Sequence, residues 1–141
     1  MSYIPRTNTT QSTPSTTAST ASTTLVMLGV AGSITPKATG ILLIIINGVG
    51  FNTTAADGYK VQISFGTGTA PTNGAALTGT QAGGVVTCTR AQAASVHIPY
   101  STNAIVTGLT IGTTYWIDLA YAAVTGGAAT VSDVSLTVIE L

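Results

Sequence analysis

Alternation of apolar and polar residues, the pattern of a β-strand with one buried face, recurs along most of this chain. Residues 59–65 carry their apolar side chains at the odd positions, and residues 115–121 repeat the pattern. Residues 41–46 are continuously branched aliphatic, which is typical of a strand buried on both faces. In residues 131–141 the alternation changes parity near Ile139, which predicts a bulge or burial of both faces.

Turn signals separate these apolar runs. Asn47-Gly48, Asp57-Gly58 and Asn73-Gly74 supply the positive φ values of tight turns. Further turns are expected at Gly32-Ser33, Gly83-Gly84, Gly112 and Gly126-Gly127. About eight short strands with this punctuation, and no stretch with a helical apolar period, predict an all-β protein, a β-sandwich of jelly-roll type. Residues 66–95, rich in Gly, Thr and Ala, are expected to form long loops and an edge strand.

The N-terminal segment differs from the remainder in composition. Between residues 7 and 24 nearly every residue is Thr, Ser, Ala, Asn, Gln or Pro, which is too little apolar area to offset the entropy of ordering. We therefore predict an extended arm over residues 1–23 and a sandwich domain over residues 24–141. The arm can pair with the sheet edge of a neighbouring chain. Its expected anchor is the bulky cluster Tyr3, Ile4 and Pro5, with Arg6 adding a charge-assisted contact.

Charge is scarce in this chain. Of its 141 residues, four are Lys or Arg and four are Asp or Glu, so the charged share of 6% is well under the roughly 25% of ordinary soluble domains. A neutral polar surface favours self-association, and we expect a homo-oligomer, most simply a trimer. No basic patch is available for nucleic-acid phosphates or anionic lipid. The apolar runs are too short to span a membrane as a helix, and we see no secretion signal.

The sequence offers little for catalysis, so we expect a protein that is not an enzyme and has no cofactor. Nucleophilic catalysis would need Cys88, His97 and Asp118 to converge. Paired carboxylates are disfavoured because Asp57 lies in a turn and Glu140 next to the last residue. One Cys and one His make a metal site within one chain improbable, although His97 or Asp118 could bind a metal on an oligomer axis. The single cysteine allows no internal disulfide.

Trp116 and Asp118 are the candidate surface residues. Alternation places Tyr115 and Tyr121 on one face of their strand, where we expect core packing, and Trp116 on the other face with Asp118 and Ala120. A tryptophan in this position is either an anchor of a subunit interface or a platform for a ligand such as a sugar, and we favour the interface.

Residues 108–115, Gly-Leu-Thr-Ile-Gly-Thr-Thr-Tyr, resemble the tyrosine corner of fibronectin type III domains. In that corner a Leu and a Gly-Thr turn precede a Tyr that closes the corner. The resemblance implies that Tyr115 has this role here.

A wider resemblance covers residues 35–141. The segments 39–44, 59–71, 112–120 and 134–141 are similar to those of small tailed-phage virion proteins. The resemblance implies a trimeric jelly roll like that of tumour necrosis factor, with the N-terminal segment attached to the particle. It also implies a capsid decoration or head-fibre subunit on the virion surface, made in the host cytoplasm. Its partners would be its own copies and the major capsid protein or another virion protein.

Two alternatives remain at this point. A receptor- or glycan-binding fibre tip would carry exposed aromatic side chains at one end of the sandwich. A Thr-rich protein that binds a flat surface such as ice would need regular Thr-x-Thr rows, but the pairs Thr67/Thr69 and Thr87/Thr89 recur without a fixed period.

Overall fold

The computed structural model describes residues 9–12, 17–89 and 93–141. Within these residues every regular element is a β-strand, which confirms the predicted all-β class. The strands are β1 (Thr9–Ser12), β2 (Ala18–Thr20), β3 (Val26–Met27), β4 (Gly32–Ile34), β5 (Leu42–Asn52), β6 (Gly58–Thr67), β7 (Thr80–Thr89), β8 (Ile98–Val106), β9 (Tyr115–Ala123) and β10 (Ala129–Glu140).

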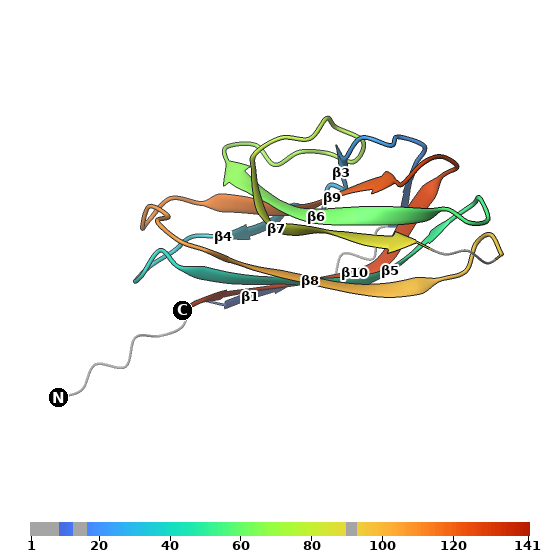
Figure 1. Cartoon of the computed structure of the whole chain (residues 1–141). Helices are drawn as coiled ribbons and strands as arrows, with labels where there is room; N and C mark the ends of the chain where they lie inside the picture. The colour runs from blue at the N-terminus through green and yellow to red at the C-terminus, as the bar shows by residue number, and fades with distance from the viewer. Residues whose placement is uncertain (1–8, 13–16, 90–92) are drawn as a thin grey trace.

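These strands form two antiparallel sheets packed face to face (Figure 1). Sheet A has the order β1, β10, β5 and β8, and β2 pairs with another part of β10. Sheet B has the order β3, β9, β6 and β7, and β4 pairs with another part of β9. Because β1 and β2 share one edge, and β3 and β4 another, each pair acts as one interrupted strand, and the ten strands reduce to eight.

When these eight strands are numbered along the chain, their spatial order is 1, 8, 3, 6 in sheet A and 2, 7, 4, 5 in sheet B. Almost every connection therefore crosses from one sheet to the other, which is the double Greek-key order of a jelly roll. The predicted β-sandwich of jelly-roll type is confirmed.

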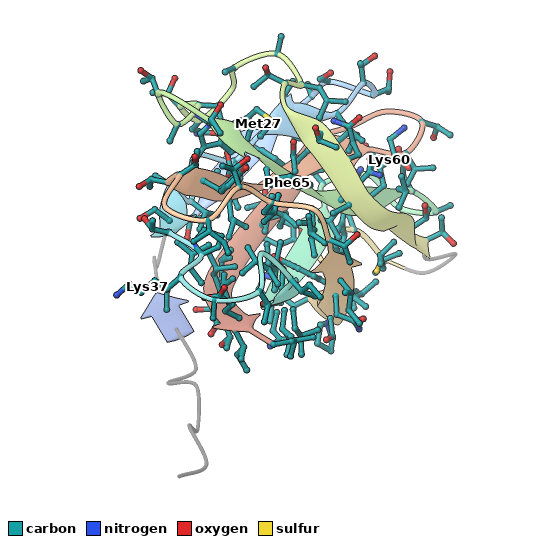
Figure 2. All side chains as sticks on the ribbon, turned by 90° about the vertical axis from the view of Figure 1, so that its left-hand side faces the viewer. Met27, Lys37, Lys60 and Phe65 are labelled. Atoms are coloured by element: carbon teal, nitrogen blue, oxygen red, sulfur yellow. The ribbon has the colours of Figure 1, made fainter. Side chains whose placement is uncertain are left out.

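The core lies between the two sheets. Its largest fully buried side chains include Tyr59 and Tyr121 from sheet B and Ile44 and Leu136 from sheet A. Phe65 closes this core near one end of the sandwich, where Figure 2 shows it between the sheets. Burial of aliphatic side chains at about 25 cal/mol per Å² is the main force that holds the layers together.

β5 shows why one prediction about burial fails. Leu42, Ile44 and Ile46 face the core and are buried, whereas Leu43 and Ile45 on the other face are only half-buried. The prediction that this run is buried on both faces is wrong within one chain, because the second layer of the sandwich covers only the inner face of sheet A.

The turn predicted at Asn47-Gly48 is also wrong, since β5 continues through it to Asn52. A Cβ on Gly48 would lie 2.5 Å from the hydroxyl oxygen of Tyr100, and one on Gly50 would lie 2.7 Å from the ring of Tyr59. These glycines let aromatic rings approach the backbone rather than making a turn.

Of the other predicted turns, some are wrong and some are confirmed. Gly32-Ser33 lies inside β4, and Gly83-Gly84 lies inside β7 where the register with β6 shifts. The turns at Asn73-Gly74 and Gly112 are confirmed. So is the edge strand expected within residues 66–95, which is β7.

The bulge predicted in the last strand exists, but at another position. The register between β10 and β5 shifts between Ser132 and Ser135, where Asp133 has a φ of 53°. From Val134 onward the alternation continues unbroken. Ile139 therefore lies on the outer face of sheet A, and Glu140 lies on the inner face and is buried.

The expected boundary at residue 24 needs correction. β1 and β2 precede it and pair with β10, with Thr9 opposite Ile139 and Ala18 opposite Val131. Ala18 is also buried in the main core. A polar segment can join a sheet in this way because main-chain hydrogen bonds need no apolar side chains. The proposed anchor Tyr3, Ile4, Pro5 and Arg6 lies outside the described residues.

Candidate functional surface

Trp116 lies on the outer side of sheet B, but it is not on the surface of the molecule. Its side chain is only 6% exposed and packs with Met27 and Ala120 in a second small core. The 67–79 segment covers the ring, and the indole Nε1 donates to the carbonyl of Thr67 at 3.1 Å. Met27, which belongs to this small core, is labelled in the upper part of Figure 2. The expectation of an exposed platform or interface anchor at Trp116 is therefore wrong.

Asp118 is fully buried two residues further along β9. β3 and β4 both pair with β9, and the chain between them leaves the ladder. The carboxylate fills this gap, because Oδ2 accepts the N–H of Gly29 at 2.9 Å and Oδ1 accepts that of Val30 at 2.7 Å. Oδ1 also accepts the N–H of Leu119 at 2.8 Å. Burial raises the pKa of Asp118, and these hydrogen bonds offset only part of that effect.

Glu140 holds the loop before β5 in a similar way. Its carboxylate accepts the backbone N–H groups of Lys37, Ala38 and Thr39 at 2.8 Å each and that of Gly40 at 3.2 Å. Burial opposes ionisation, but the four donors outweigh it and lower the pKa of Glu140 to about 2. The residue therefore acts as an ionised tie between β10 and the 36–40 loop.

Asp57 and Asn52 tie the loops at the other end of β5. Asp57 accepts backbone N–H groups from Gly58 at 2.7 Å, Thr125 at 3.1 Å and Gly126 at 2.6 Å. Burial acts to raise its pKa, but these donors lower it below the usual value. The amide of Asn52 donates to the carbonyls of Gly58 at 2.7 Å and Gly126 at 2.9 Å. One end of the sandwich is thus joined through buried polar groups.

Three of the four acidic residues of the chain are therefore used to bind backbone N–H groups. The fourth, Asp133, is exposed at the bulge and accepts a hydrogen bond from the hydroxyl of Ser132 at 3.1 Å. Glu140 and Asp57 lie at opposite ends of β5 and do not face each other across a cleft. This arrangement supplies loop rigidity and leaves no described pair of carboxylates placed for acid–base chemistry.

The combination Cys88, His97 and Asp118 is not assembled. Cys88 pairs with Tyr59 in β6, whereas Asp118 pairs with Ser64. Five residues of β6 separate these positions, or about 17 Å, and Asp118 points to the outer side of the sheet. His97 is exposed, and its ring packs edge-on against Phe51 with centroids 4.7 Å apart.

The described residues carry few features of other kinds of site. They contain no group of three or more His, Cys, Asp or Glu side chains that could hold a metal ion. They also contain no helix that is long and apolar enough to cross a membrane. None of their Phe, Tyr or Trp side chains is exposed, since each is buried or half-buried.

The tyrosine-corner contact is present at the start of β9. The hydroxyl of Tyr115 accepts the backbone N–H of Thr110 at 3.0 Å, and a Tyr bonded to backbone a few residues upstream defines that corner. Its ring is half-buried and lies 6.3 Å from that of Phe65. The bond fixes the turn at Gly112 to the strand that follows.

Sequence reasoning missed the roles of Glu140, Asp57 and Asn52. One signal was available for Glu140: it continues the even-numbered series Val134, Leu136 and Val138 that faces the core. A buried carboxylate at such a position needs several hydrogen-bond donors, and a nearby loop can provide them. No comparable pattern marks Asn52, since one of its two acceptors, the carbonyl of Gly126, lies 74 residues away.

Comparisons with known proteins give matches only at the level of structure. No family model and no curated protein matches this chain. The structure of the VP2 subviral particle of infectious bursal disease virus matches 96% of the chain with a TM-score of 0.55 and 15% identity. The structure of the Gx strain of that virus matches 95% with a TM-score of 0.55 and 16% identity.

A third structure, of T=1 particles derived from the same virus, matches 96% of the chain with a TM-score of 0.56 and 13% identity. The chain spans about a third of the length of these proteins, 33%, 33% and 32% respectively. At such identities the likeness shows a common fold, and the sandwich described above is the part that is shared.

Proposed function

We propose that this chain is a structural protein of a virus particle, which works by binding rather than by catalysis. The observation that carries the proposal is the jelly-roll sandwich, which matches proteins of virus particles over 95% or more of the chain. The use of buried acids as loop ties supports it, because these residues stabilise a rigid body instead of serving a reaction.

The more specific proposal is a decoration or head-fibre subunit on the virion surface. The sandwich is the projecting body, and the segment before β1 attaches it to the major capsid protein or to another virion protein. β1 lies at the edge of sheet A, so the segment that precedes Thr9 is joined to the body at a sheet edge. The bulky residues Tyr3, Ile4 and Pro5, with Arg6 beside them, would supply the contacts.

The location can be tested by electron microscopy of gradient-purified particles of the virus that encodes the chain, with an antibody raised against residues 24–141. We expect regularly spaced label on the particle surface, and none after competition with the free protein. Absence of the chain from purified particles, checked by mass spectrometry of the same gradient fractions, would contradict the proposal.

The glycan-binding alternative loses its main support. It predicts exposed aromatic side chains at one end of the sandwich, and the described residues contain no exposed Phe, Tyr or Trp. Trp116, which motivated it, is covered by the chain's own 67–79 segment. We therefore propose a particle-building role ahead of receptor or sugar recognition.

A further inference from the structure

The two outer faces of the sandwich differ in how they are covered. On sheet B, Trp116, Asp118 and Ala120 point outward, yet all three are buried because the 25–31 and 67–79 segments lie over them. In Figure 1 these segments form the layer above β6 and β9, whereas no such layer of described residues lies below sheet A. As far as the described residues go, the outer face of sheet A is thus the open one.

The open face of sheet A carries a cluster of six aliphatic side chains, which we call the aliphatic patch. Its members come from three neighbouring strands and from the residues just before β5 and just after β10: Ile41, Leu43, Ile45, Ile105, Ile139 and Leu141. Leu43 lies opposite both Ile105 and Ile139 in the ladder, and the N–H of Leu141 binds the carbonyl of Ile41 at 2.9 Å. Ile105 is 63% exposed and Leu141 is 52% exposed.

We propose that this outer face of sheet A is the surface through which the chain binds a second copy of itself. The inference deepens the proposed function and rests on it for the expectation that copies assemble. An aliphatic patch of this kind on an open sheet face marks an interaction site rather than an ordinary solvent surface.

Charge selects a second copy as the partner. In β5, β8 and β10, all of whose residues the structure describes, the charged residues are Asp133 and Glu140. Glu140 points into the sandwich and is tied to the 36–40 loop, and Asp133 lies at the bulge, away from the patch. Two copies of such a face meet without like-charge repulsion, and a charged partner would find nothing to pair with.

The area of the face is also close to that of a stable interface. Four strands at about 4.8 Å spacing and about ten residues at about 3.3 Å rise give a face of about 600 Å² before pleating is counted. Stable interfaces bury about 800 Å² on each partner. The face is therefore close to what a stable pair of copies needs, and the aliphatic patch lies at the end of the face where β5 begins and β8 and β10 end.

The test is the mass of the full-length protein, measured by size-exclusion chromatography with light scattering across the micromolar range. Ile105→Lys and, separately, Leu141→Lys place a charge on the patch at positions that are exposed in the single chain. Val85→Lys is the matched control, because Val85 is an aliphatic residue 47% exposed on β7, in the other sheet. Thermal melts verify that each variant is folded.

We expect an oligomer for the wild type and for Val85→Lys, and a dissociation constant raised about tenfold or more for both patch variants. A monomeric wild type, or patch variants that keep its mass, would overturn the proposal. Equal dissociation in Val85→Lys, or dissociation only when residues 1–8 are deleted, would also overturn it. Binding to particles is measured separately by co-sedimentation. An oligomer that does not bind particles would contradict the proposed function but would agree with this inference.

Discussion

Single buried polar groups determine much of this molecule's local structure. Asp57, Asp118 and Glu140 each accept three or more backbone N–H groups, so each of them replaces hydrogen bonds that a regular ladder would have supplied. One buried hydroxyl is an exception, since the Tyr100 oxygen has no partner among the described residues. Substitutions at these buried polar groups are therefore expected to raise stability at some positions and to lower it at others.

Tyr100→Phe and Tyr59→Phe should change stability in opposite directions. Both rings are buried and contact each other at 5.9 Å between centroids. Tyr59 donates to the carbonyl of Ile98 at 2.6 Å, whereas the Tyr100 hydroxyl has no partner in the described part of the chain. We expect Tyr100→Phe to be neutral or to stabilise by up to about 1 kcal/mol, and Tyr59→Phe to destabilise by about 1 kcal/mol. Denaturant midpoints for the two variants decide this, and equal losses in both would contradict it.

The lowered pKa of Glu140 predicts how the stability of the fold depends on pH. Its pKa in the folded protein, about 2, lies below the ordinary value of 4.5. The ionised form therefore favours folding, so its stabilisation is complete above about pH 5 and is lost as the pH falls towards 2. We expect the melting temperature of the wild type to decline across this interval.

Glu140→Gln should remove most of that decline and should lower stability at neutral pH by about 1–3 kcal/mol, because the amide nitrogen cannot accept an N–H. A smaller slope from Asp57, whose pKa is also lowered, should remain. Asp133→Asn is the control, since this acid is exposed, and it should melt with the pH profile of the wild type. An unchanged acid slope in Glu140→Gln would show that the tie to residues 37–40 does not stabilise the fold.

At the scale of elements, the strands are longer than the spacing of glycines implies. β5 continues through Asn47, Gly48 and Gly50. The two glycines are needed because the rings of Tyr100 and Tyr59 occupy the space where a side chain at these positions would lie. β7 contains Gly83-Gly84 at its register shift, and a Cβ on Gly84 would meet nothing within 4 Å. Glycines within strands of the same chain therefore serve different purposes.

Gly50→Ala and Gly84→Ala test this difference. The added methyl of Gly50→Ala would lie 2.7 Å from the Tyr59 ring, and relieving that contact should cost about 1–3 kcal/mol. Gly84→Ala has free space and should be neutral or gain about 0.5 kcal/mol from reduced chain entropy. Urea unfolding monitored by circular dichroism measures both, and similar midpoints for the two variants would contradict the packing argument.

At the scale of the whole molecule, the N-terminal region has two parts. Residues 9–12 and 18–20 complete sheet A by pairing with β10, and the proposed attachment is assigned to residues 1–8. A β10 without these partners would expose a long row of unpaired backbone groups, which is a hazard for aggregation.

Two deletions separate the parts. Removal of residues 1–8 should leave the melting temperature unchanged and should abolish co-sedimentation with particles. Removal of residues 1–23 also takes away β1, β2 and the buried Ala18, and it should lower the melting temperature and promote aggregation. If the shorter deletion still binds particles at the occupancy of the wild type, residues 1–8 are not the attachment segment.

The sequence by itself determined the class of this protein. Period-two alternation in 59–65 and 115–121 is a local property of the pleated strand, so it identified β6 and β9 and the side of each that faces the core. Scarcity of charge and the lack of a recognisable catalytic set are properties of composition, and they are the basis for the expectation of a binding protein.

Only the tertiary structure decided which faces of the sheets are covered and which glycines lie in turns. Trp116 is buried by a segment about 40–50 residues away in sequence, and Gly48 is required by a ring 52 residues further on. The polar residues 9–12 belong to the sandwich because β10, 124 or more residues later, offers them a sheet edge. Such long-range pairings leave no periodic trace in the chain, because each depends on where the fold brings a distant partner.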